Sequence, residues 1–135
     1  GGFQRVLPDR EVSHPRLLLL CSGKVYFDLL AHRRETERDD VAIARVEQFY
    51  PLHDETLEAA CGHYDQAVPV RWVQEEPRNM GAWSYWHNRF GDRFLESHAL
   101  DVAARAESAS PATGSKSRHK REQQALLEQA FADPP

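Results

Sequence analysis

The run Leu17-Leu18-Leu19-Leu20-Cys21 constrains the fold most strongly, because it is apolar at every position and is followed at once by turn residues. A short run of this kind is typical of a β-strand that is buried on both faces. Ser22-Gly23 follows as a tight turn, and residues 24–37 then place Val25 and Leu29 on one helical stripe. Strand, tight turn and helix in this order predict the opening of a parallel crossover unit.

The same order recurs along the rest of the chain. Expected strands are residues 3–7, 16–21, 41–47, 69–75 and 100–105, and expected helices are residues 24–37, 54–64, 82–96 and 117–133. Parallel strands joined by right-handed helical crossovers are the common solution to this order, so we expect an α/β fold with a mostly parallel five-stranded sheet. We expect a single domain over residues 1–135, with residues 1–15 as edge strand and loop and residues 16–133 as the α/β core.

Residues 72–83 join a buried strand to an aromatic helix through a charged turn. Pro77 and Gly81 predict the turn, and Glu75 and Glu76 stand where the strand meets solvent. Two interpretations of this acidic pair are open. It belongs to a functional surface, because ligands and partners gather at the carboxyl ends of parallel strands, or it is a solvated strand end whose carboxylates pair with Arg71 or Arg78.

The helix after this turn is unusually aromatic. The spacing predicts that its aromatic residues share one face, with Tyr85 beside them: Trp83, Trp86, Phe90 and Phe94. These side chains are more apolar surface than one helix face can hide, so we expect part of it to belong to an interface.

Composition excludes several classes of function. A net charge of -4 argues against general nucleic-acid binding, which needs a basic face. The basic cluster at residues 116–121 is either a contact for an anion or acidic partner, or simply the exposed first turns of a helix. No apolar run approaches the length of a membrane span, and the start does not resemble a signal peptide. Cys21 and Cys61 lie within apolar runs and predict reduced core thiols, which indicates a cytoplasmic protein.

No motif predicts a self-sufficient active site. The seven histidines show no metal-ligand spacing, and Ser22 lacks the first glycine of a nucleophile elbow. In residues 113–117, Ser115 interrupts the Gly-Lys pair of a phosphate loop. What remains is Ser22-Gly23-Lys24, which is either an anion site at a helix amino terminus or an ordinary tight turn. We therefore expect a small module of a larger protein, with no catalytic, cofactor-binding or metal-ligating residue of its own.

Four blocks of sequence, taken together and in order, resemble one family. They are residues 21–30 (CSGKVYFDLL), 41–51 (VAIARVEQFYP), 73–83 (VQEEPRNMGAW) and 108–115 (SASPATGS), followed by a last helix with Glu122-Gln123-Gln124. The chain resembles the carboxyl-terminal domain of the thiamine-dependent, decarboxylating component of the 2-oxoglutarate dehydrogenase complex. The combination of residues 75–83 with the Ser-Pro-Ala-Thr-Gly block distinguishes this branch from a related transketolase-family domain of a pyruvate or branched-chain enzyme.

The resemblance implies a three-layer α/β/α sandwich of the transketolase carboxyl-terminal type. It implies a parent enzyme in which thiamine diphosphate and magnesium lie between two larger, preceding domains, so this domain would hold neither. The implied partners are the preceding domains of the same chain, a homodimer partner and the dihydrolipoyl succinyltransferase core, with no nucleic acid and no membrane. The alternative is a stand-alone module that senses an acyl-CoA or a nucleotide without catalysis.

The resemblance also assigns candidate residues. The candidates for a regulatory anion, acetyl-CoA or a nucleotide, are Ser22, Gly23, Lys24 and Arg105. The candidates for structural turns and interfaces are Glu75, Glu76, Asn79, Gly81, Trp83, Pro111 and Gly114. Met80 departs from the family pattern, which has glutamine there, and a thioether has almost no hydrogen-bonding capacity, so a ligand contact through this position is not expected.

Overall fold

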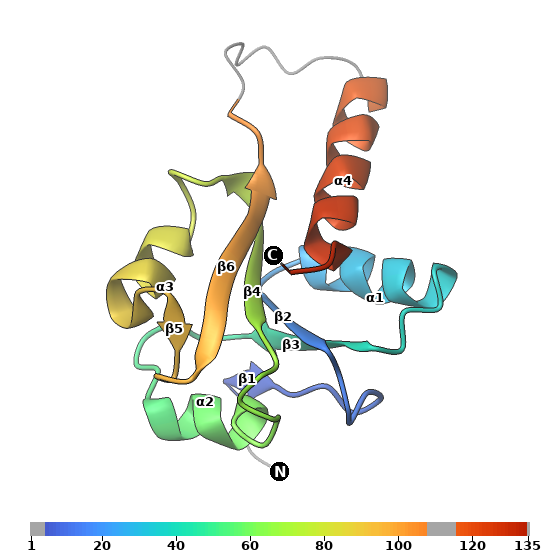
Figure 1. The fold of residues 1–135 in the computed structure, drawn as a ribbon. Helices are drawn as coiled ribbons and strands as arrows, with labels where there is room; N and C mark the ends of the chain where they lie inside the picture. Colours follow the sequence, from blue (N-terminus) through green and yellow to red (C-terminus); the bar gives the residue numbers. More distant parts are fainter. Residues whose placement is uncertain (1–4, 108–115, 135) are drawn as a thin grey trace.

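The computed structural model describes residues 5–107 and 116–134, and within them six strands form one sheet in the order β1-β3-β2-β4-β6-β5 (Figure 1). The strands are β1 (Val6–Leu7), β2 (Leu17–Cys21), β3 (Val41–Val46), β4 (Val70–Pro77), β5 (Arg93–Phe94) and β6 (His98–Arg105). The helices are α1 (Val25–Glu35), α2 (Asp54–Cys61), α3 (Trp83–Phe90) and α4 (Lys116–Phe131). The four central strands are parallel, whereas β1 and β5 pair antiparallel at the two edges. The predicted mostly parallel α/β fold is confirmed.

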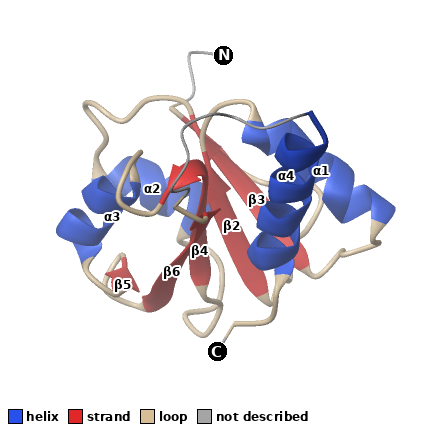
Figure 2. Ribbon diagram, turned by 90° about the horizontal axis from the view of Figure 1, so that it is seen from above, coloured by secondary structure: helices blue, strands red, loops and turns tan. Residues whose placement is uncertain are grey.

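The helices cover both faces of the sheet, with α1 and α4 on one side and α2 and α3 on the other (Figure 2). The alternation of β2 explains this arrangement, because successive side chains on a strand point to opposite faces. Leu18 and Leu20 pack with α2 and α3, whereas Leu17, Leu19 and Cys21 pack with α1 and α4. All five side chains are buried, so the prediction of a strand covered on both faces is confirmed.

The aromatic helix is shorter than predicted. It ends at Phe90, because Gly91 adopts a φ of 66° that a right-handed helix does not allow. Phe94, predicted on the helix face, instead lies on β5, where it pairs with His98 of β6. This two-residue strand is the one missing from the predicted five, and the sheet therefore has six strands in the described part of the chain.

The aromatic surface is also used differently from the prediction. Trp83, Trp86 and Phe94 are buried within the domain, and the half-buried Tyr85 and Phe90 pack against the same cluster. Their partners come from the sheet and from the loop after β3: the Phe49 ring lies 5.8 Å from Trp72 and 5.4 Å from Tyr85. The domain therefore hides most of the apolar surface that we expected to be surplus, and only the half-buried Tyr85 and Phe90 are left for the predicted interface.

The polar loop after β1 is fastened to the core by Asp9. Its carboxylate accepts hydrogen bonds from the backbone N–H groups of Glu11, Val12 and Ile43 at 2.7–2.9 Å and pairs with the buried Arg33. Burial by itself would raise the pKa of the Asp9 carboxyl, but the hydrogen bonds from Arg33 and the backbone outweigh it, and the pKa lies below its usual value. Edge strand β1 is thereby held against β3.

Candidate functional site

The carboxyl ends of three neighbouring parallel strands, β3, β2 and β4, lie together on one side of the sheet. We call this side, where these strands end, the carboxyl edge. A cavity of about 300 Å³ lies there. The residues that line it follow β2, follow β3, or belong to β4 and the turn after it: Ser22, Gly23, Lys24, Val25, Phe49, Trp72, Val73, Gln74, Glu75, Glu76 and Ala82. Five of the residues predicted from sequence, Ser22, Gly23, Lys24, Glu75 and Glu76, are thus brought together in one place.

The Ser22-Gly23-Lys24 turn has the predicted form. Gly23 adopts a φ of 76°, which favours glycine, and no atom stands within 4 Å of the position where a Cβ would be. Lys24 is exposed at the amino end of α1, and no side chain caps the helix there. The turn therefore presents an ammonium group and a helix amino terminus to open space, which is the geometry that both sequence interpretations share.

The turn after β4 is organised by Gln74, a buried side chain that the sequence analysis did not single out. Its amide oxygen accepts hydrogen bonds from the Trp72 indole N–H at 2.9 Å and the Trp83 backbone N–H at 3.0 Å. Its amide nitrogen donates to the carbonyls of Glu76, Pro77 and Met80 at 3.2, 2.7 and 2.7 Å. An amide side chain directly after the apolar pair Trp72-Val73, in a strand predicted to be buried, was the signal that could have identified it, because buried amides are almost always hydrogen-bonded.

Gly81 completes this turn. It adopts a φ of 68°, and a Cβ at this position would lie 3.1–3.2 Å from the amide atoms of Gln74. Strand β4 continues through Glu75 to Pro77, with a shift of register after Val73, so the strand end lies two residues later than predicted. Glu76, Asn79 and Gly81 are exposed, whereas Trp83 is buried.

Arg105 ends β6 and lies among acidic and amide side chains. Its guanidinium is 4.0 Å from the Glu75 carboxylate and 3.6 Å from that of Glu122, and it donates to the Gln123 side-chain oxygen. It lines a separate cavity of about 420 Å³ beside α4, not the cavity that holds Lys24. Glu75 thus pairs with Arg105 and not with Arg71 or Arg78, the partners expected for a solvated strand end. Two further candidates, Pro111 and Gly114, lie outside the described residues.

The basic cluster at residues 116–121 forms the first turns of α4, as the simpler of its two interpretations predicts. Arg118 pairs with Glu122 one turn later at 3.1 Å, and Lys116, Lys120 and Arg121 are exposed. The cluster is therefore a solvated helix surface in this structure.

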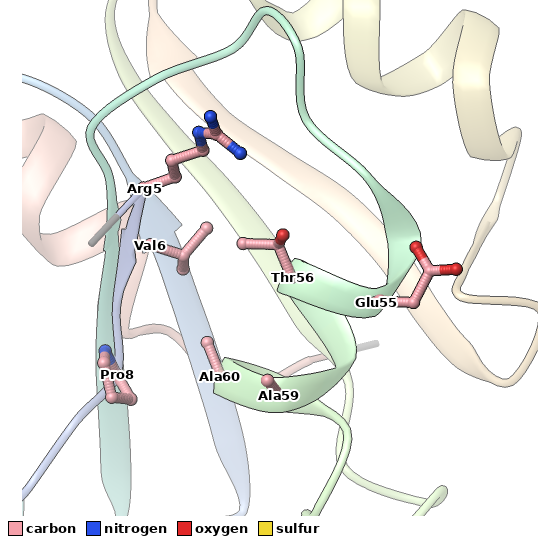
Figure 3. Close-up of a pocket in the computed structure, with 7 residues that line it drawn as sticks. All are labelled: Arg5, Val6, Pro8, Glu55, Thr56, Ala59 and Ala60. Atoms are coloured by element: carbon pink, nitrogen blue, oxygen red, sulfur yellow. The ribbon is translucent and has the colours of Figure 1, made fainter. Parts of the chain in front are cut away.

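A larger hollow of about 550 Å³ lies between β1 and α2. Figure 3 shows Val6 on the side of β1 facing Thr56 and Ala60 of α2, with Arg5 above them. Sequence reasoning missed it, because it is built from two segments that are far apart in the chain and individually ordinary.

Besides the cavities, the metal-binding and nucleophilic groups of the described residues bear on what the site can do. Residues 5–107 and 116–134 contain no group of three or more His, Cys, Asp or Glu side chains placed to hold a metal ion. Burial raises the pKa of the Cys21 and Cys61 thiols to about 12, so both remain protonated and poorly nucleophilic. No helix in the described part of the chain combines the length and apolar character of a membrane span.

The fold and this edge define a mainly parallel α/β domain with a cavity at the carboxyl ends of its central strands. A family model described as the 2-oxoglutarate dehydrogenase C-terminal domain matches residues 1–131, and the chain belongs to that family.

Similar proteins span both bacteria and animals. The chain is 40% identical to the 2-oxoglutarate dehydrogenase E1 component of Cupriavidus necator and 42% identical to that of Azotobacter vinelandii, covering 98% and 97% of this chain. It is 36% identical to the mitochondrial 2-oxoglutarate dehydrogenase of Caenorhabditis elegans, and this match covers 99% of the present chain. In each case the chain spans 14% of the relative's length, so it corresponds to one domain of a much longer protein.

Proposed function

We propose that this domain is the packing and dimer-forming end of an enzyme that oxidatively decarboxylates 2-oxoglutarate. That enzyme would transfer the succinyl group to the lipoyl arm of a dihydrolipoyl succinyltransferase core in the citric acid cycle. The observation that carries the proposal is the match to the 2-oxoglutarate dehydrogenase C-terminal family over residues 1–131. The stand-alone sensor is not supported, because similar sequences form 14% of much longer enzymes.

Thiamine diphosphate and magnesium would be held by the domains that precede this one. In support of this, residues 5–107 and 116–134 place no three His, Cys, Asp or Glu side chains together as a metal site. In this proposal the domain contributes no proton transfer and no ligand to the reaction. It stabilises the assembled enzyme, and it contacts its neighbours and the second subunit. The buried free thiols support a reducing compartment, and we propose the cytoplasm.

Calorimetry with thiamine diphosphate and Mg²⁺ tests whether the cofactor binds to the preceding domains and not to this one. We expect no heat of binding with the 135-residue chain and saturable binding with a longer chain that includes the preceding domains. The longer chain should also release carbon dioxide from 2-oxoglutarate. Saturable binding of the cofactor by the 135-residue chain would contradict the proposal.

We also propose Ser22, Gly23 and Lys24 as the contact for an anionic regulator, either acetyl-CoA or a nucleotide. Its support is the exposed ammonium of Lys24 and the open space over Gly23. Because Glu75 and Glu76 on the same cavity wall repel an anion, Lys24 would have to supply most of the attraction. Arg105 would reach such a ligand only by exchanging its carboxylate partners. Titration of the full-length enzyme with acetyl-CoA and AMP should show saturable binding that Lys24→Ala weakens, and a flat titration at millimolar ligand would contradict it.

A further inference from the structure

The large apolar side chains that the described residues leave exposed are three in number, and all lie beyond the carboxyl ends of parallel strands. Phe27, in the first turn of α1 after β2, is 58% exposed; Tyr50, after β3, is 90% exposed; Met80, after β4, is 58% exposed. Strands β3, β2 and β4 are consecutive in the sheet. The exposed large apolar side chains of the described residues therefore all follow the carboxyl ends of these three strands, whereas on a free surface such side chains are usually scattered.

The three exits are neighbours in space as well as in topology, because Gly23, Phe49 and Ala82 line the same cavity. A pair of opposite charges adjoins Phe27. The Arg45 guanidinium lies 5.1 Å from the centre of the Phe27 ring and 3.6 Å from the Glu47 carboxylate. An apolar centre with a rim of mixed charge is the usual composition of an interface between protein domains.

The path of the chain indicates which partner is near. The Arg5 carbonyl accepts hydrogen bonds from the N–H groups of Glu47 and Gln48 at 2.7 and 3.3 Å, just past the carboxyl end of β3. Strand β1 runs antiparallel to β3, so the polypeptide enters the domain from the carboxyl edge. Asp133, in contrast, pairs at 2.7 Å with Arg16, which precedes β2, so the polypeptide leaves at the opposite edge.

The related proteins are much longer than this chain, and their extra length would lie before this domain. The matched family is a C-terminal one, and the chain spans 14% of the relatives' length, so most of the protein would precede Arg5. We propose that the carboxyl edge, centred on Phe27, Tyr50 and Met80, is the face against which a preceding domain of the same polypeptide packs. This inference rests on the proposed function, which makes the chain the last domain of a longer enzyme.

Oxidation of Met80 in the full-length enzyme tests the inference directly. Met80 is the only methionine of this chain, and trypsin releases it in the peptide of residues 79–89. We expect peroxide to oxidise it about tenfold or more slowly in the folded enzyme than in the urea-unfolded enzyme, because an interface excludes the oxidant. Hydroxyl-radical labelling of Tyr50 should fall in parallel. A Met80 oxidation rate within about threefold of the unfolded rate would overturn the inference.

A pair of variants tests whether the surface that covers the carboxyl edge belongs to a preceding domain. Met80→Glu places a charge in the turn after β4. Ala67→Glu is the control: it places the same charge in the exposed turn before β4, at the amino ends of the parallel strands. In the full-length enzyme, Met80→Glu should increase proteolytic cleavage between the preceding domain and Arg5 about tenfold, because the unfavourable buried charge separates the domains. Ala67→Glu should leave the cleavage rate unchanged.

Unchanged cleavage in Met80→Glu would overturn the assignment to a preceding domain. If, in addition, light scattering showed that Met80→Glu is a single chain where the wild type is a dimer, the face would belong to a second copy. These readouts do not depend on turnover of 2-oxoglutarate. An inactive wild-type enzyme with a protected Met80 would contradict the proposed function alone, and an active one with a freely oxidised Met80 would contradict this inference alone.

Discussion

Replacing Arg71 with methionine is expected to lower the free energy of unfolding by about 3 kcal/mol, measured by urea denaturation of the chain. The Arg71 guanidinium is buried beneath the end of α4, where it donates to the carbonyls of Gln129, Ala130 and Ala132 at 3.2, 2.8 and 2.7 Å. It also pairs with Asp101 of β6 at 2.9 Å. Methionine fills similar space but leaves the carbonyls of the helix end without this donor, and buried carbonyls lose their bonds to water as well.

Arg38→Met is the matched control for this prediction. Arg38 also donates to a carbonyl at the end of α4, that of Phe131 at 3.1 Å, and also pairs with an aspartate, Asp40. Its side chain is 29% exposed, whereas that of Arg71 is 5% exposed, so water replaces much of what the substitution removes. We expect Arg38→Met to cost about 1 kcal/mol or less. Equal losses in the two variants would show that burial of Arg71 is not the cause.

Gln74→Leu is expected to destabilise the domain by about 3 kcal/mol and to loosen the turn between β4 and α3. The substitution is close to isosteric, yet it removes all five hydrogen bonds of the amide. The Trp72 indole N–H and the Trp83 backbone N–H would lose this acceptor in a buried environment. Urea denaturation followed by tryptophan fluorescence measures both the loss of stability and the change around these indoles.

Gln48→Leu provides the comparison, because the Gln48 side chain makes one hydrogen bond, to the Tyr50 carbonyl at 2.8 Å, and that bond is exposed to solvent. We expect this variant to stay within about 0.5 kcal/mol of the original chain. If Gln74→Leu were equally mild, the turn would be held by its backbone conformation and not by the amide.

Local patterns were sufficient for most of the regular structure. The run Leu17–Cys21 and its Ser-Gly turn predicted a strand covered on both faces and a helix after it, and both are present. Apolar periodicity located the other central strands and the last helix to within a few residues. Helix α3 was extended too far, because Phe94 continues its apolar spacing although Gly91 has already ended the helix.

Part of the candidate site could also be predicted. Ser22, Gly23, Lys24, Glu75 and Glu76 line one cavity, because the carboxyl ends of adjacent parallel strands share an edge. Arg105 was grouped with Lys24 through a family resemblance, and the structure places it in a different cavity. The strand order, β2 between β3 and β4 with β6 beyond, determines that separation, and periodicity contains no information on strand order.

The amino-acid sequence alone therefore determined most of the elements, their alternation and the family, because each of these depends on short blocks of residues close together in the chain. Only the tertiary structure decided the partners of Arg71, Gln74 and Arg105 and the gathering of Phe27, Tyr50 and Met80 at one edge. Those contacts join residues from different elements, and they depend on how the sheet is ordered and twisted, which no local pattern encodes.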